Sequence, residues 1–264
     1  MIDHWKDKLA VITGASSGIG EAIARKLAAQ GLQVVLVARR RERLESLADE
    51  IRAGGGVASI LAADLTSEAD RLRLCEQAGS ADVLVNNAGL GWYGYGDEMS
   101  WKTAQEILQV NVEAVVQLSL TFLSRMRQRN TGHIINIGSI SGSLPSQGIA
   151  LYGATKSFLD NFSTALYREL AGTRVHVSVV RAGPVKTEFA GAALLHENGY
   201  HLPTEKMGVT AEKVAERIWT LVRHPRRLIY IPNYLLIVPW LELSFGWIID
   251  RVGPLLLKKQ KTAQ

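Results

Sequence analysis

Short apolar runs alternate with longer amphipathic stretches along most of this chain. The runs are rich in β-branched residues and apolar on both faces, as the central strands of a parallel sheet are. They occupy residues 8–13, 33–38, 57–64, 81–86, 133–139, 174–180 and 227–232. The stretches between them carry the apolar period of a helix and occupy residues 20–30, 41–54, 67–78, 99–128, 147–170 and 211–223. Strands that alternate with helices form right-handed βαβ units, so we predict an α/β fold with three layers, a doubly wound parallel sheet between two layers of helices.

Composition narrows the classes of protein that remain. The chain has 264 residues, 47% of them hydrophobic, which suits one large α/β domain with a substantial core. Cys75 is the only cysteine, so no intrachain disulfide can form, and we expect a reducing, cytoplasmic compartment. The net charge of +5 suits an anionic ligand or a membrane surface but is too diffuse to indicate nucleic acid. The histidines do not have the spacing of metal ligands, so we predict no metal site.

A glycine-rich turn, TGASSGIG, joins the first predicted strand to the first predicted helix. Gly14 can take the tight turn, Gly18 lets the backbone approach a phosphate, and Gly20 permits close packing of helix on strand. The start of the helix then presents unpaired N–H groups and a partial positive charge, which suit a pyrophosphate. A purely structural turn is the alternative, but the position between a strand and a helix favours dinucleotide binding.

The end of the second predicted strand indicates which dinucleotide binds. An NAD site usually has an acidic residue there for the ribose hydroxyls, but Ala38 stands in that place. Arg39 and Arg40 follow it, and their guanidinium groups can bind a 2′-phosphate through paired hydrogen bonds. The alternative is a solvated basic start of a helix, which the helix dipole disfavours because it prefers acids at that end. We therefore predict NADP(H) as the cofactor.

Tyr152 and Lys156 are four positions apart within the predicted helix at 147–170. Residues at that spacing share one face of a helix. Taken alone, such a pair is more commonly a lysine that extends past a half-buried tyrosine. The other reading is chemical, because a nearby ammonium group favours the phenolate and lowers the tyrosine pKa from about 10 towards neutral pH.

These motifs, in this order, make the sequence resemble the short-chain dehydrogenase/reductase family, of the type that prefers NADP, over roughly residues 8–230. The resemblance rests on TGASSGIG, NNAG at 86–89, and the residues Asn111, Ser139, Tyr152 and Lys156. It implies a Rossmann fold in which these last four residues are catalytic. Tyr152 is then the general acid or base, and Ser139 holds the substrate oxygen. Lys156 also binds the cofactor ribose, and Asn111 fixes a water that relays protons.

The same resemblance assigns further residues to the cofactor. Asp64 and Leu65 hold the adenine, residues 87–89 line the adenosine ribose, and residues 182–187 touch the nicotinamide. One departure from the family pattern is Ala182 in place of the usual proline, although Pro184 still restrains the loop. The predicted cofactor residues are Gly14, Ser16, Ser17, Gly18, Ile19, Gly20, Arg39, Arg40, Asp64, Leu65, Asn87, Ala88, Gly89, Tyr152, Lys156, Gly183, Val185 and Thr187.

The sequence constrains the substrate less than the cofactor. A predicted lid at 189–207 and the loop after Gly89 are rich in large apolar residues, which could wall a pocket for an apolar or aromatic ketone, aldehyde or secondary alcohol. A lid that packs only on its own domain would have the same composition. A non-catalytic NADP-binding sensor or scaffold is a second alternative, but such proteins commonly lose the tyrosine or the lysine, and this chain keeps both.

The chain continues past the predicted Rossmann-fold dinucleotide-binding and catalytic domain, residues 1–231, into an apolar extension with a basic tail, residues 232–264. Residues 235–249 read LLIVPWLELSFGWII. This stretch is shorter than the about 20 residues of a spanning helix, and it is too apolar to lie exposed on a soluble monomer. It can pack on protein, over the substrate pocket or within a homodimer or homotetramer, or it can make a peripheral contact with an anionic membrane surface. We prefer packing on protein.

Overall fold

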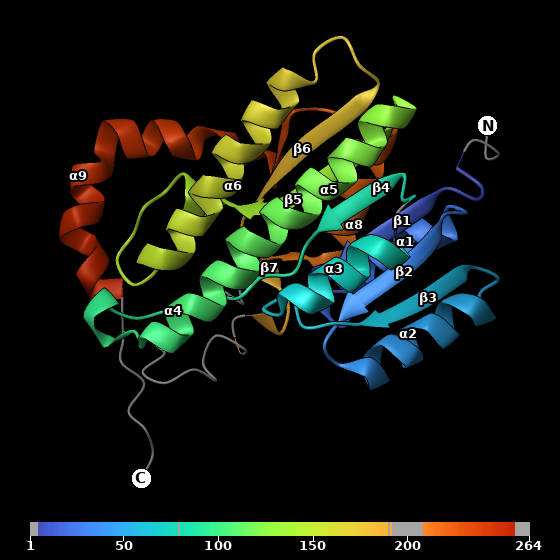
Figure 1. Ribbon diagram of the computed structural model, residues 1–264. Helices are drawn as coiled ribbons and strands as arrows, with labels where there is room; N and C mark the ends of the chain where they lie inside the picture. Colours follow the sequence, from blue (N-terminus) through green and yellow to red (C-terminus); the bar gives the residue numbers. More distant parts are fainter. Residues whose placement is uncertain (1–4, 79, 190, 192–207, 257–264) are drawn as a thin grey trace.

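The computed structural model describes residues 5–78, 80–189, 191 and 208–256 (Figure 1). Its main feature is a seven-stranded sheet with the order β3-β2-β1-β4-β5-β6-β9, in which all neighbouring strands are parallel. The strands are β1 (Leu9–Thr13), β2 (Gln33–Ala38), β3 (Val57–Ala62), β4 (Val83–Asn86), β5 (Gly132–Ser139), β6 (Val175–Ala182) and β9 (Leu228–Ile231). The strand order reverses between β1 and β4, so a ligand crevice is expected at the carboxyl ends of these two strands.

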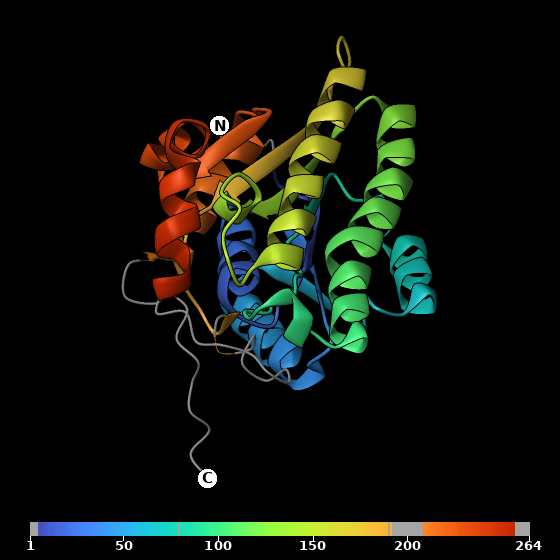
Figure 2. The same cartoon turned by 90° about the vertical axis from the view of Figure 1, so that its left-hand side faces the viewer.

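Helices cover both faces of the sheet, as Figures 1 and 2 show. Ala10 and Ile12 of β1 pack into one core with α1 (Gly18–Ala29), α2 (Arg41–Ala53) and α8 (Ala211–Arg223). Val11, between them, faces the opposite core with α3 (Glu68–Gln77), α5 (Ala114–Arg129) and α6 (Ala150–Glu169). Neighbouring residues of a strand point to opposite faces, so both faces of β1 are apolar and buried. The predicted α/β class and the doubly wound parallel sheet are confirmed.

The helix predicted at 99–128 differs most from its prediction. A helix α4 (Trp101–Leu108) and helix α5 are joined by a five-residue π-helical turn, η2 (Gln109–Glu113). One extra residue in a turn barely disturbs the apolar period, so the sequence reads as one continuous helix. Such π-turns occur often at functional sites, and this one contains the predicted site residue Asn111.

Within the described residues, one helical stretch is long and apolar enough to cross a membrane by length and composition alone, Trp101–Arg129. It combines α4, η2 and α5, and half of its most apolar window is buried inside the protein. Leu118 and Phe122 of this stretch belong to the core that contains Val11, α3 and α6. We therefore interpret it as a core helix.

The C-terminal extension forms a helix that the sequence pattern did not predict. After β9 come a 3₁₀ turn, η5 (Asn233–Ile237), and α9 (Val238–Leu256). Pro239 lies in the first turn of α9, where a helix needs no N–H donor, so the helix can continue past it. Helix α9 lies at the periphery of the molecule in both views (Figures 1 and 2). Its outward side chains are strongly exposed, as at Trp240 (69%), Leu243 (81%) and Trp247 (61%).

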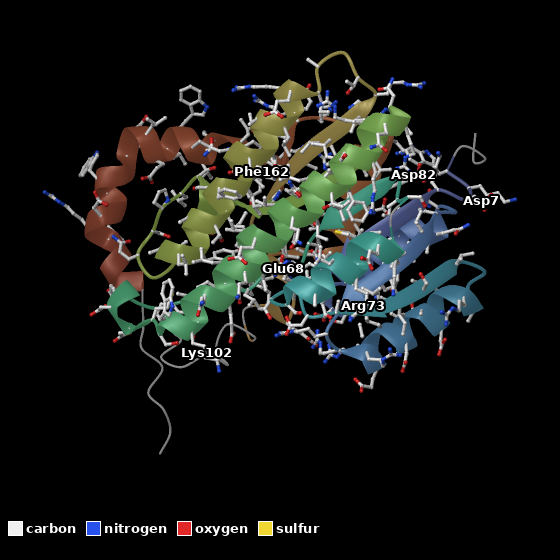
Figure 3. All side chains as sticks on the ribbon, in the orientation of Figure 1. Asp7, Glu68, Arg73, Asp82, Lys102 and Phe162 are labelled. Carbon is white, nitrogen blue, oxygen red and sulfur yellow. The ribbon has the colours of Figure 1, made fainter. Side chains whose placement is uncertain are left out.

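Two smaller features lie at opposite edges of the sheet, one at the amino ends of its strands and one past their carboxyl ends. At its amino edge Lys8 forms an ion pair with Asp82, Nζ to Oδ1 3.1 Å; Asp82 is labelled in Figure 3. Past the carboxyl edge, β7 (Val185–Lys186) pairs with β8 (Val209–Thr210) in a separate two-stranded sheet. The predicted lid at 189–207 lies between β7 and β8, and apart from Phe189 and Gly191 it is outside the described residues.

Candidate active site

The end of β5 and one face of α6 bring the predicted catalytic residues together. Ser139, the last residue of β5, is buried and makes a hydrogen bond with Tyr152. Lys156 follows one helical turn later, and its Nζ lies 5.6 Å from the centre of the Tyr152 ring. This Nζ donates a 3.0 Å hydrogen bond to the carbonyl of Ile137, two residues before Ser139. The serine, the tyrosine and the lysine therefore form one cluster at the carboxyl edge of the sheet.

The pKa values of Tyr152 and Lys156 differ from those expected from the sequence. Burial raises the pKa of Tyr152 above its ordinary value, and Tyr93 raises it further, while the hydrogen bond with Ser139 acts in the opposite direction. Burial therefore outweighs the lowering expected from Lys156, whose ammonium lies 5.6 Å from the centre of the tyrosine ring and donates to the Ile137 carbonyl. The pKa of Lys156 is itself lowered to about 8 by burial. At neutral pH the site thus combines a protonated phenol, which can donate a proton, with an ammonium group.

Asn111 locks the π-turn to the site. Its Oδ1 accepts from the Leu90 N–H at 2.8 Å, and its Nδ2 donates to the Leu90 carbonyl at 2.9 Å and to Thr155 Oγ1 at 3.1 Å. Thr155 lies between Tyr152 and Lys156 in the sequence, so Asn111 connects the loop after β4 to the catalytic face of α6. A Cβ on Gly89 would make only ordinary contacts, 3.4 Å from Asn111 Oδ1 and 3.6 Å from Lys156 Nζ, so this loop residue lies close to both side chains. The side-chain amide of Asn111 thus holds the loop after β4 against α6, and the water relay expected of Asn111 stays a prediction.

The glycine-rich turn packs against the end of β4. Gly14 has a φ of 66°, and a Cβ there would lie 2.9 Å from Asn87 Nδ2. The same Nδ2 donates to the Thr13 carbonyl at 2.9 Å. Thr13 Oγ1 accepts from the N–H groups of Asn87 and Ala88 at 3.0 Å each. This holds the turn and the NNAG segment as one unit at the switch point of the sheet. The sequence reading did not assign this role to Thr13.

The predicted nicotinamide segment lies beside the same turn. Gly18 has a φ of 59°, and a Cβ on it would lie 2.9 Å from Thr187 Cγ2. Gly183 donates its N–H to the Ile231 carbonyl at 2.8 Å, which fixes the segment to β9. Val185 belongs to β7 and packs against the core of α1 and α8. The structure therefore places the predicted nicotinamide segment next to the glycine-rich turn that is predicted to bind the pyrophosphate.

The arginines at the end of β2 are placed differently from each other. Arg40 donates to Ser17 Oγ at 2.7 Å and to Ser16 Oγ at 3.0 Å, so it bridges β2 and the glycine-rich turn. Arg40 also pairs with Glu188 at 3.3 Å, and this carboxylate pairs with Arg43 at 2.9 Å. Both arginines lower the pKa of Glu188, Arg43 most strongly. Arg39 is exposed. The sequence reading missed Arg43 and Glu188, whose pairing depends on the tertiary fold.

The predicted adenine residues follow β3, which ends at Ala62. Asp64 Oδ1 accepts from the N–H and the hydroxyl of Thr66, at 3.0 and 2.9 Å, in a local turn. Leu65 is buried in the core with α3 and α5. One oxygen of the Asp64 carboxylate is therefore engaged within its own loop, and Leu65 anchors that loop in the core. Ile19, also predicted, packs partly buried against the core of α1.

Aromatic side chains surround the tyrosine. The ring of Phe189 lies 5.8 Å from that of Tyr152, centre to centre. Phe189 also approaches Gly91, where a Cβ would lie 2.9 Å from the ring. Trp92 and Tyr93 follow and are buried. Burial raises the pKa of Tyr93 to about 12, so it stays protonated. The described part of the surroundings of Tyr152 is thus largely apolar and aromatic.

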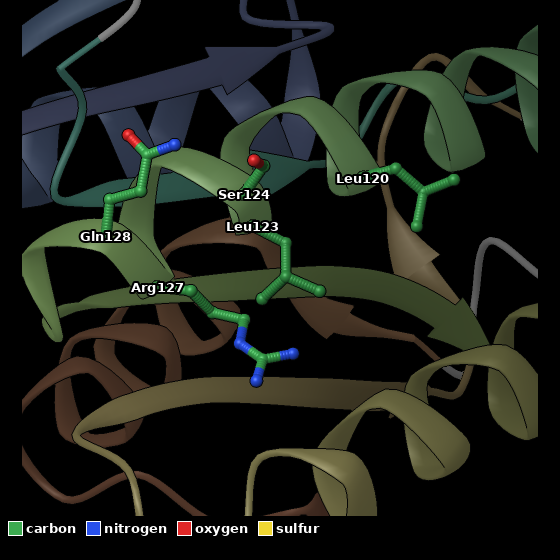
Figure 4. Close-up of a pocket in the computed structure, with 5 residues that line it drawn as sticks. All are labelled: Leu120, Leu123, Ser124, Arg127 and Gln128. Atoms are coloured by element: carbon green, nitrogen blue, oxygen red, sulfur yellow. The ribbon is translucent and has the colours of Figure 1, made fainter.

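Two other features are separate from this cluster. A groove of about 380 Å³ runs along α5 and is lined by Leu120, Leu123, Ser124, Arg127 and Gln128 (Figure 4). It contains none of the predicted catalytic or cofactor residues, so it is no candidate for the active site. Among the described residues no group of three or more histidine, cysteine, aspartate or glutamate side chains is placed to hold a metal ion.

A phosphate-binding turn and an acid–base pair at one edge of a doubly wound sheet are the features of a dinucleotide-dependent oxidoreductase. Residues 8–198 match the sequence profile of the family described as short chain dehydrogenase, and the chain belongs to this family. It is 36% identical over 219 residues to an NADP-dependent 3-hydroxy acid dehydrogenase of Shigella flexneri, a match that covers 80% of this chain and 87% of the relative.

Solved structures agree with this assignment. The closed form of a serine dehydrogenase complexed with NADP+ superposes with a TM-score of 0.77 at 33% identity, covering 84% of this chain and 93% of that chain. A short-chain dehydrogenase from Sphingobium yanoikuyae in complex with NADPH gives a TM-score of 0.79 at 31% identity, covering 97% and 98%. The likeness to the second structure therefore extends into the C-terminal extension.

Proposed function

We propose that this chain reduces a carbonyl group, or oxidises a secondary alcohol, of an apolar or aromatic small molecule, with Tyr152 as the general acid or base. The chain is an NADP-dependent short-chain dehydrogenase/reductase, and the bound cofactor supplies the hydride. Ser139 holds the carbonyl oxygen by a hydrogen bond, and Tyr152 gives this oxygen its proton. Lys156 stabilises the phenolate that remains and binds the cofactor ribose. The observation that carries the proposal is the cluster of Ser139, Tyr152 and Lys156 at the crevice edge.

The site residues suit a dinucleotide phosphate. Gly14 and Gly18 have positive φ angles and leave no room for a Cβ, so the backbone of the turn can approach a pyrophosphate at the start of α1. Arg39 and Arg40 supply positive charge beside it for a 2′-phosphate. We assign the binding of NADP to the eighteen residues predicted from the sequence, within a domain that ends at residue 231. A non-catalytic sensor of the same fold is the alternative, and retention of both Tyr152 and Lys156 argues against it.

Turnover on matched carbonyl compounds tests the substrate class. The surroundings of Tyr152 include Phe189 and Tyr93, which favours an aromatic ketone or aldehyde over a polar acid. The named 3-hydroxy acid dehydrogenase relative makes a hydroxy acid the competing class. We expect a higher kcat/KM for aryl ketones than for 3-oxo acids of similar size, measured by NADPH oxidation. A preference for the acids would overturn the substrate class, and no turnover of any carbonyl compound would overturn the proposed reaction.

Substitution of Arg39 tests how the cofactor phosphate is bound. A hydrogen bond to a charged group contributes about 1.5–3 kcal/mol, so Arg39→Ala should weaken NADPH binding roughly 10- to 100-fold and NADH binding little. Fluorescence titration with both cofactors measures this. The matched control is Arg41→Ala, because Arg41 lies in the same basic run but pairs with Glu45 at 3.2 Å. Equal losses for NADPH and NADH would show that Arg39 does not recognise the phosphate.

We propose that the chain works in the cytoplasm as a homodimer or homotetramer. Exposed apolar side chains occur on three peripheral helices, with Leu120 on α5, Phe158 on α6 and Trp240 on α9. A soluble protein rarely leaves so many large apolar groups uncovered. For α9 the alternative is a peripheral contact with an anionic membrane, because its tryptophans are followed by Arg251, Lys258, Lys259 and Lys261.

Deletion of residues 235–264 tests whether α9 packs on protein or contacts a membrane. If α9 packs on protein, the intact chain should ignore anionic vesicles and the truncated chain should form smaller oligomers or bind substrate less tightly. Co-sedimentation with phosphatidylserine vesicles and analytical ultracentrifugation measure the two properties. Vesicle binding that disappears with the deletion, at unchanged oligomer size, would replace the protein contact by the membrane contact.

A further inference from the structure

The catalytic face of α6 carries a third ionisable residue, Asp160, one turn after Lys156. Tyr152, Lys156 and Asp160 follow one another at intervals of four, so they share one face of the helix. That face meets the end of β5 at three successive residues. The carbonyl of Ile137 accepts from Lys156, and Ser139 makes its hydrogen bond with Tyr152. Between them Gly138 lies against the carboxylate of Asp160, because a Cβ there would be 3.5 Å from its Oδ1.

The Asp160 carboxylate is buried, at 5% exposure, and only one of its two oxygens accepts a hydrogen bond from the described residues. Its Oδ2 accepts from Arg181 Nε on β6 at 2.9 Å. Its Oδ1 is buried and has no hydrogen-bond partner among the described residues. A buried carboxylate with a free oxygen costs several kcal/mol unless a charge compensates it. Lys156 is such a charge, and the two groups attract each other electrostatically.

Arg181 is held in place in turn. Its NH1 donates to the hydroxyl of Tyr230 on β9 at 2.6 Å. The strands β6 and β9 are neighbours in the sheet, with Arg181 opposite Tyr230 in the register. A chain of hydrogen bonds therefore runs from Tyr230 on the edge strand β9 through Arg181 to Asp160, which lies one helical turn after Lys156.

We propose that Asp160 is a positioning residue that holds Lys156 in its ammonium form, and that Arg181 and Tyr230 keep the carboxylate ionised and in place. This inference rests on the catalytic roles proposed above for Tyr152 and Lys156. A lysine buried without a nearby carboxylate readily loses its proton, and it then can neither stabilise a phenolate nor attract the ribose hydroxyls as strongly. Asp160 acts through Lys156 and does not touch the reacting atoms.

The charges around the pair set the expected direction of the effect. The charged groups that face it in the described structure are Lys156 and Asp160 on α6 and Arg181 on β6; the titratable hydroxyls are those of Tyr152, Tyr230 and Tyr93. Burial lowers the pKa of Lys156 to about 8, and Asp160 opposes this lowering. Burial raises the pKa of Asp160 to about 6, and Arg181 opposes that. At pH 7 both carry charge, so the ammonium is present below about pH 8 and is lost above it.

The test is the pH dependence of the Asp160→Asn protein, whose amide keeps the shape of the side chain without the charge. Removal of an opposite charge should lower the pKa of Lys156 by about one unit or more. The alkaline fall of kcat should then begin roughly one pH unit lower than in the parent protein. The pH at which NADPH affinity weakens should move in the same direction. The second readout needs no turnover, so it distinguishes failure of this inference from failure of the proposed reaction.

Two further variants keep the test decisive if the single change destabilises the fold by leaving Arg181 unpaired. The double variant Asp160→Asn/Arg181→Gln removes both charges and should shift the alkaline fall in the same direction but by less, because loss of the Arg181 guanidinium favours the Lys156 ammonium. Asp82→Asn is the matched control, because Asp82 is a part-buried, lysine-paired carboxylate at the opposite edge of the sheet, and it should keep the parent profiles. Unchanged profiles, or a loss that is equal at every pH in a folded Asp160→Asn protein, would overturn the inference.

Discussion

Replacement of Tyr152 by phenylalanine should lower kcat by about 10²–10⁴ and leave both the fold and NADPH binding intact. The reason is specific to the hydroxyl, which the Tyr152 side chain directs to Ser139 at the end of β5. Phenylalanine keeps the ring beside Phe189 and beneath the Lys156 ammonium, so packing changes little. Steady-state rates of carbonyl reduction, with NADPH affinity measured separately, show the split between rate and binding.

The control for this variant is Tyr167→Phe. Tyr167 lies on the same helix, and its side chain is exposed, so loss of its hydroxyl should leave kcat at the parent value. A Tyr152→Phe protein that turned substrate over at nearly the parent rate would show that another group supplies the proton.

Replacement of Lys156 by methionine should damage both the rate and the cofactor affinity. We expect kcat to fall by about 10²-fold or more, because the phenolate left after proton transfer loses its positive neighbour. NADPH affinity should fall roughly 10- to 100-fold through lost hydrogen bonds to the ribose. Methionine preserves the length of the buried side chain, so the helix should stay packed on Ile137. Stopped-flow measurement of hydride transfer gives the rate, and fluorescence titration gives the NADPH affinity.

Lys26→Met is the matched control, because Lys26 pairs with Glu216 on the opposite face of the protein and should affect neither quantity. If Lys156→Met lowered the rate and left NADPH binding unchanged, the ribose contact would be wrong and the electrostatic role would stand. Parent values for both would remove Lys156 from the mechanism.

The sheet could be predicted because parallel strands buried on both faces are short, uninterrupted apolar runs. Val11 and Ile12 face opposite cores and are both fully buried. Their strand is therefore a continuous apolar run, which can be recognised although apolar and polar residues do not alternate in it. Helix α9 could not be predicted in the same way. Its segment is apolar in nearly every direction, so it lacks the one-sided period that marks a surface helix, and Pro239 suggested an interruption.

The candidate site was predictable where spacing along the chain fixes geometry, as for Tyr152 and Lys156 on one helix face. It was not predictable where burial or distant residues decide. The raised pKa of Tyr152 follows from its burial beside Tyr93, which the spacing to Lys156 does not encode. A role for Asp160 could not be predicted, because it depends on the hydrogen bond from Arg181, which only the tertiary fold brings near.

The central claim is that this chain moves a hydride from NADPH to a carbonyl carbon. The most direct measurement uses NADPH deuterated at the hydride-donating carbon of the nicotinamide and an aryl ketone, with mass spectrometry of the alcohol formed. We expect one deuterium on the carbinol carbon, formed in step with NADPH consumption and far more slowly by the Tyr152→Phe protein. NADPH that persists unchanged with every ketone and oxo acid offered, or an alcohol without the label, would contradict the account.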